Sequence, residues 1–192
     1  PWSAWRVPLL VRSQTRLGQD TVEQAIASLV RRHDILRLAI DATTLPLTGR
    51  LDTDRRVPMT FHGAGEVSDA EEILATCCAK PPADDSVVEA HLWDGESGGS
   101  LLGLALPHAF VDDASQVILL DELAKLLDGV EDLPPTTSSW VSWTRLASRL
   151  AKHPLVTQGA EQRSAGASVR RPMQRSYQRS VLPLEQIGRA HV

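Results

Sequence analysis

The stretch LALPHAFVDDASQVILLDELAKLL, residues 104–127, joins an apolar segment, a single histidine and the start of a helical pattern. The leucine-rich residues that lead into it are typical of a strand buried on both faces. Pro107 has no backbone N–H, so we expect strand pairing to end there. Asp112 or Asp113 then stands where a carboxylate is favoured as a helix N-cap. The pattern therefore predicts that His108 lies at the mouth of a buried strand, next to a helix N-terminus.

This local pattern allows two interpretations of His108. It is either a structural histidine satisfied by its neighbours or a general base. Histidine suits base catalysis because its ordinary pKa of about 6.5 is close to neutral pH. It can take a proton from an amine or hydroxyl nucleophile, an effect worth roughly 10²–10⁴ in rate. The carboxylate four residues later could order the turn by pairing with a buried arginine from elsewhere, since a buried charge needs a partner.

The whole chain has 192 residues, of which 42% are hydrophobic and 23% charged, values typical of one globular domain. Its net charge of −4, without a basic stripe, argues against nucleic acid as a partner. No apolar run approaches the ~18 residues of a membrane span. Cys77 and Cys78 are adjacent and form no disulfide framework, which favours buried thiols in a reducing compartment. We expect a cytoplasmic protein whose first residue, not Met, is not its native start.

Hydrophobic periodicity predicts alternating strands and helices. Asp20 with Glu23, and Ser68 with Glu71, have the spacing of capping boxes. We expect an α/β fold of the α+β two-layer type, with a mixed, largely antiparallel sheet and helices packed on one face. The predicted strands are 4–14, 35–40, 57–63, 87–93 and 100–106; the predicted helices are 21–33, 68–80, 113–127 and one from Ser138 or Ser139 to Lys152; residues 41–55 are predicted to be a loop.

A second segment, LVRRHDILRLAI at residues 29–40, ends a predicted helix and enters a strand. Taken alone it is a helix C-terminus with cations, as the helix dipole prefers. It resembles the RHExLRxxF segment of condensation domains of nonribosomal peptide synthetases, and LPHAFVDDAS resembles their HHxxxDGxS segment. The wider chloramphenicol-acetyltransferase-like acyltransferases share only HxxxD. The two segments have the family's order and a family-like separation, and the similarity extends over most of residues 5–155.

The resemblance implies roles for particular residues. His108 matches the histidine that contacts the reacting centre, where it acts as base or positions the acceptor amine and stabilises the tetrahedral intermediate. Asp112 matches a structural aspartate that pairs with an arginine, which the resemblance puts at Arg32, with Arg37 as the second choice. Ser115 matches the serine of the motif.

Two positions depart from the family pattern. Pro107 replaces the first histidine of the family's pair, a position that is usually supportive. Asp113 replaces a glycine that keeps the substrate channel open beside the histidine, so its side chain could narrow the channel or add charge to it. Besides a condensation domain, two alternatives therefore stay open: a stand-alone CoA- or carrier-dependent O- or N-acyltransferase, and a non-catalytic docking domain inside a synthetase.

The resemblance also implies a mechanism and partners. An aminoacyl or peptidyl thioester on one phosphopantetheine arm would meet an acceptor amine on another, with donor and acceptor peptidyl carrier domains and an adenylation domain in the same parent chain. No cofactor would be bound directly. We expect no metal, because the other histidines (His33, His62, His91 and His153) show no ligand spacing.

The resemblance further implies three segments. Residues 1–155 would form the N-terminal lobe of a condensation domain, and 156–186 a linker toward a C-terminal lobe that is missing from this chain. Residues 187–192, IGRAHV, are similar to the translation of a sequencing-library adapter and are expected to be an artefact. Without the second lobe, we expect the 192-residue chain to be inactive by itself.

Overall fold

The computed structural model describes residues 5–41, 48–63, 70–79, 87–95, 98–136 and 138–158. The chain divides after Ala147 into two compact units. In the second unit, the described residues comprise the end of one helix and a helical turn at 154–158. The sheet and the candidate site lie in the first unit.

The main sheet has four strands in the order β1 (Arg6–Ser13), β6 (Ser100–Pro107), β5 (Glu89–Asp94) and β4 (Met59–His62). β6 pairs antiparallel with both β1 and β5, whereas β4 runs parallel to β5. Two further strands, β2 (Leu38–Asp41) and β3 (Thr48–Leu51), form a separate antiparallel pair. The predicted fold class, with a mixed and mostly antiparallel sheet, is confirmed.

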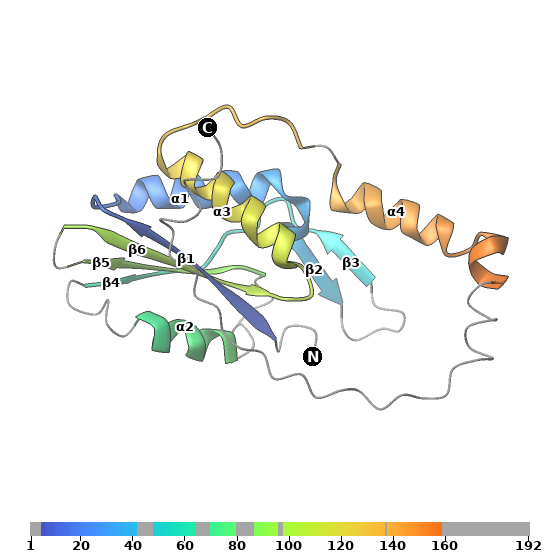
Figure 1. The fold of residues 1–192 in the computed structure, drawn as a ribbon, viewed down its shortest axis with the longest axis horizontal. Helices are drawn as coiled ribbons and strands as arrows, with labels where there is room; N and C mark the ends of the chain where they lie inside the picture. Colours follow the sequence, from blue (N-terminus) through green and yellow to red (C-terminus); the bar gives the residue numbers. More distant parts are fainter. Residues whose placement is uncertain are drawn as a thin grey trace. The chain divides into compact units, whose positions relative to one another are not determined.

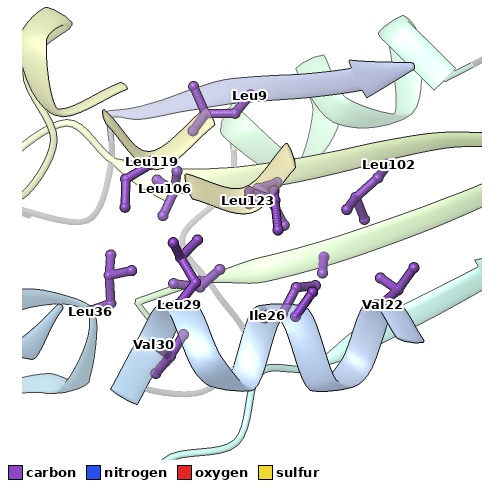
Figure 2. Close-up of a cluster of buried hydrophobic side chains, with 14 of the residues drawn as sticks. Leu9, Val22, Ile26, Leu29, Val30, Leu36, Leu102, Leu106, Leu119 and Leu123 are labelled. Atoms are coloured by element: carbon purple, nitrogen blue, oxygen red, sulfur yellow. The ribbon is translucent and has the colours of Figure 1, made fainter. Parts of the chain in front are cut away.

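Helices α1 (Gln19–Arg32) and α3 (Asp113–Leu127) cover one face of the main sheet (Figure 1). Because side chains alternate along a strand, every second residue of β6 reaches this face. Figure 2 shows the resulting core, to which β1 and β6 contribute Leu9, Leu102 and Leu106, α1 contributes Val22, Ile26, Leu29 and Val30, and α3 contributes Leu119 and Leu123.

The opposite face of the sheet is covered by α2 (Ala70–Ala79), which corrects the expectation that helices pack on one face only. Leu74 of α2 contacts Trp93 and Leu101 in a second buried cluster. Gly103 permits this close approach, because a Cβ there would lie 2.6 Å from the Leu74 side chain. Helices on both faces explain why all eight residues of β6 are buried.

Several predicted elements differ in detail. The Asp20–Glu23 capping box is wrong: Gly18 is the N-cap of α1 and no side chain caps it. The strand predicted at 35–40 begins as the 3₁₀ turn η1 (Asp34–Arg37), and the loop predicted at 41–55 contains β3. Ser68 lies outside the described residues. The strands predicted at 4–14, 57–63, 87–93 and 100–106 and the helices predicted at 21–33 and 113–127 are confirmed within a few residues.

The last residue of β6 is Pro107, as the sequence predicts. It lies opposite Arg6 in the ladder, and the next N–H, from His108, donates to the Trp5 carbonyl at 2.8 Å. Hydrogen-bonding directions alternate along an antiparallel strand, so the Pro107 nitrogen faces away from β1 and its missing proton costs no bond to that strand.

Helix α4 (Trp140–Leu150) starts where the sequence predicts. The Ser139 hydroxyl accepts the Ser142 N–H at 3.0 Å. The Asp34 carboxylate, more than a hundred residues earlier, accepts the N–H groups of Trp140 at 2.9 Å and Val141 at 3.1 Å. A distant carboxylate thus satisfies backbone donors that the first turn of a helix leaves open.

Candidate functional site

His108 is the first residue after β6, and two contacts with Trp5 hold it. Its N–H donates to the Trp5 carbonyl, and the two rings lie with centroids 4.2 Å apart at 52°. His108 is half-buried, whereas 60% of Trp5 is exposed. The histidine is therefore fixed at the end of a buried strand while its ring keeps access to solvent, as the sequence predicts.

Asp112 begins α3 as its N-cap. Its Oδ1 accepts the Ser115 N–H at 2.8 Å and the Ser115 hydroxyl at 2.5 Å. These hydrogen bonds hold the pKa of Asp112 below its ordinary value, and the charge of His108 acts in the same direction. The structure therefore brings together His108, Asp112 and Ser115, three of the predicted site residues, at one strand-to-helix turn. Asp113 is exposed in the first turn of α3.

The predicted ion pair between Asp112 and Arg32 is not formed. Asp112 is exposed and bonded to Ser115, and Arg32 instead donates from Nε to Glu122 of α3 at 2.9 Å. Arg32 also donates from Nη2 to the Pro134 carbonyl. Ser115 supplies the hydrogen-bond donors that were expected from an arginine, because the carboxylate of an N-cap residue accepts from groups in the first turn of its own helix.

Arg32 and His33 act together on Glu122. The His33 Nε2 lies 2.6 Å from the same Glu122 oxygen that accepts from Arg32. These contacts link the C-terminus of α1 to α3, and Arg32 reaches the segment that leads to α4. Arg32, His33 and Asp34 therefore have a structural role. The three residues also line one side of a cavity of about 350 Å³, whose lining includes Trp140.

Arg37, the second choice for the partner of Asp112, also lies elsewhere. Its carbonyl accepts the Asp52 N–H at 2.9 Å, and its buried Nε has no hydrogen-bond partner among the described residues. The second-choice pairing is thus not formed either.

Sequence reasoning missed Arg6, a buried arginine at the start of β1. Its Nη1 donates to Glu89 of β5 at 2.7 Å and to the Cys77 carbonyl at 3.2 Å, and its Nη2 donates to the Ala105 carbonyl at 2.8 Å. Arg6 therefore fixes β1 against β6 at the end of the sheet where the neighbouring Trp5 meets His108. The available signal was an arginine and a glutamate, each at the start of a largely apolar strand.

No protein-family model matches the chain. It is 31% identical over 147 residues to the NRPS-like tryptophan epimerase fscC of Fusarium equiseti, covering 72% of this chain and 10% of that protein. It is 27% identical over 143 residues to surfactin synthase subunit 2 of Bacillus subtilis strain 168, covering 69% of this chain and 4% of that protein.

Two solved structures share the fold. One shows condensation domain-mediated chain release from the enacyloxin polyketide synthase, with a TM-score of 0.66, 22% identity and coverage of 81% of this chain and 31% of that chain. The other is the epimerization domain of the third module of tyrocidine synthetase B, with a TM-score of 0.72, 19% identity and coverage of 89% and 42%. The chain is thus similar in sequence to nonribosomal peptide synthetases and has the fold of condensation and epimerization domains.

The chain spans a tenth or less of the length of these two curated relatives. It also covers less than half of each of the two solved chains. Among its described helices, none is both long and apolar enough to cross a membrane.

Proposed function

We propose that the chain is the N-terminal lobe of a condensation domain and contributes His108 to amide-bond-forming acyl transfer. The substrates would be an aminoacyl or peptidyl thioester and an acceptor amine, each on the phosphopantetheine arm of a carrier domain. The single observation that carries this proposal is the position of His108, half-buried at the end of β6 and held by Trp5 beside the capped N-terminus of α3.

The proposed step balances without a covalent enzyme intermediate. The amine nitrogen attacks the thioester carbonyl carbon, and a ring nitrogen of His108 accepts the amine proton. The C–N bond forms, the C–S bond of the tetrahedral intermediate breaks, and the pantetheine thiolate leaves and takes up a proton. Holding two tethered reactants side by side supplies much of the rate in such a scheme.

Asp112 would act on this step indirectly. Its carboxylate caps α3 through Ser115, and its negative charge lies near enough to His108 for the two to interact. It would therefore position the turn that follows His108.

The remaining parts of the proposal concern the parent protein. Residues 1–155 would form the lobe, 156–186 would lead to a C-terminal lobe, and 187–192 would be foreign to the native chain. Carrier and adenylation domains would be partners in the same parent. The chain alone would be inactive, because a carrier-tethered donor and acceptor would need the second lobe to complete the channel.

A non-catalytic docking role is the second candidate, and Asp113 favours it. Its carboxylate stands exposed at the start of α3, where condensation domains carry a glycine that keeps the channel beside the histidine open. A stand-alone acyltransferase is the third candidate, and it would use the same histidine with a soluble thioester.

The test is made in the complete parent protein whose reading frame contains this chain. Product formation from loaded carrier domains is compared for the parent, His108→Ala, and the control His153→Ala, which changes an exposed histidine. We expect His108→Ala to lose roughly 10²–10⁴ in rate with an unchanged circular dichroism spectrum, and the control to lose nothing. Full activity in folded His108→Ala would refute the catalytic proposal and support docking.

A further inference from the structure

Three side chains with metal-binding atoms converge on the face of the sheet that α2 covers. The Cys77 Sγ, a Glu89 carboxylate oxygen and a His91 ring nitrogen all lie within 4.8 Å of one another. The His91 Nε2 is 3.3 Å from the Cys77 Sγ and 3.5 Å from the Glu89 Oε1. The proposed acyl transfer uses none of them.

The fold itself brings these residues together. Glu89 and His91 are two residues apart on β5, so their side chains leave the same face of the sheet. Cys77 lies in the last turns of α2, which packs across that face through Leu74 and its close approach to Gly103. Spacing along the sequence does not reveal the group, because its members come from two elements.

We propose that Cys77, Glu89 and His91 form a zinc-binding site that is independent of the proposed acyl-transfer function. Thiolate, imidazole and carboxylate are the donors that Zn²⁺ takes in proteins. With bonds of about 2.0–2.3 Å, neighbouring donors of a tetrahedral zinc lie about 3.3–3.8 Å apart. The distances of 3.3 and 3.5 Å from His91 fall in that range.

Two neighbouring residues, His62 and Arg6, hold two of the ligands in orientation. The His62 Nε2 lies 3.1 Å from the His91 Nδ1. A hydrogen bond at Nδ1 leaves the lone pair of Nε2 directed at the metal. Arg6 holds the other carboxylate oxygen of Glu89 at 2.7 Å and so orients the oxygen that faces His91.

The local charges and burial also suit a zinc ion. The thiolate and the carboxylate together neutralise the two positive charges of Zn²⁺, which leaves the Arg6 guanidinium as the one excess charge in this group. His91 is 4% exposed, whereas Cys77 and Glu89 are half-buried. Three protein ligands leave a fourth position for water, so we expect an accessible site that exchanges its metal.

Metal titration of the purified 192-residue chain tests this proposal. The protein is treated with chelator under reducing conditions and titrated with Co²⁺, which reports thiolate coordination by an ultraviolet charge-transfer band, and then with Zn²⁺. We expect one equivalent of Co²⁺ to give that band and Zn²⁺ to remove it by displacement.

Two adjacent cysteines provide a matched control, because only Cys77 belongs to the group. We expect Cys77→Ser to lose the charge-transfer band and to bind Zn²⁺ at least about 100-fold more weakly, and Cys78→Ser to keep both. The His62→Gln variant should weaken Zn²⁺ binding about 10–100-fold while keeping the band. Circular dichroism of the metal-free variants checks that each remains folded.

Three results would refute the proposed zinc site. Absence of the band at one equivalent, or equal loss in the Cys77→Ser and Cys78→Ser variants, would show that the Cys77–His91 contact is only an S–H···N hydrogen bond. A Zn²⁺ affinity unchanged in folded Cys77→Ser and His91→Gln would have the same meaning. None of these results depends on condensation activity, so the site and the proposed function fail separately.

Discussion

Replacing Arg6 by methionine removes the guanidinium that joins β1 to α2, β5 and β6. The Arg6 side chain is completely buried, and Glu89, its partner, is 28% exposed. Removing one member of a buried ion pair costs about 3–5 kcal/mol. Because water can reach Glu89, the cost of breaking this pair is lower than that figure. The carbonyls of Cys77 and Ala105 also lose a hydrogen-bond donor, which costs about 1–3 kcal/mol for each carbonyl that water cannot reach. Since methionine regains some apolar contact, we expect Arg6→Met to lower the free energy of unfolding by about 2–4 kcal/mol.

Arg16→Met is the matched control. Arg16 also pairs with a carboxylate of β5, Asp94, but its side chain is 73% exposed. Such surface pairs contribute about 0–1 kcal/mol. Both variants are unfolded with urea in the presence of chelator, and the transition midpoint and slope are compared with the parent chain.

The double variant Arg6→Met/Glu89→Leu completes the test. It removes both charges, so we expect it to recover much of the loss of the single variant. A loss below about 1 kcal/mol in Arg6→Met, or one equal to that of Arg16→Met, would refute the view that Arg6 anchors β1.

Three further predictions concern other contacts. Gly103→Ala should cost about 1–3 kcal/mol of unfolding free energy, because its Cβ would meet Leu74 at 2.6 Å, whereas Gly63→Ala, with nothing within 4 Å, should be nearly neutral in the same urea titration. Asp34→Ala should cost about 0.5–2 kcal/mol and reduce amide-exchange protection at the start of α4; unchanged protection would contradict the long-range cap. Asp112 has a lowered pKa, so its cap is complete above the ordinary aspartate pKa and is lost as pH falls through the folded value. NMR titration should place the pKa of Asp112 below the ordinary aspartate value, and a pKa at or above that value would contradict the cap.

The parts of the fold that local patterns determine were predictable. The continuous apolar run predicted β6, and the leucine spacing predicted α3 with an N-cap at Asp112 or Asp113, of which the structure has Asp112. The position of His108 between them follows from these two elements. The position of His108 at the end of the strand could therefore be predicted without knowledge of any contact between residues distant in sequence.

Partners chosen by tertiary structure could not be predicted. The two arginines considered for Asp112 lie elsewhere, with Arg32 on Glu122, because the competition between Ser115 and a distant guanidinium depends on the paths of α1 and α3. The short strand β3 has little apolar signal, since three of its four residues are exposed, and pairing with β2 defines it. The group of Cys77, Glu89 and His91 depends likewise on where α2 crosses the sheet.

The pairing of β1 with β6 has a consequence for the time course of synthesis. In the ladder, Ser13 lies opposite Ser100 and Arg6 opposite Pro107. At about 5–20 residues per second, a ribosome makes β1 roughly 4–20 s before β6 is complete. β5 and β6 are close in sequence and can pair first. The apolar residues of β1 must therefore be kept from solvent in another way, such as packing against α1, until the β5–β6 hairpin has been synthesised and can pair with β1.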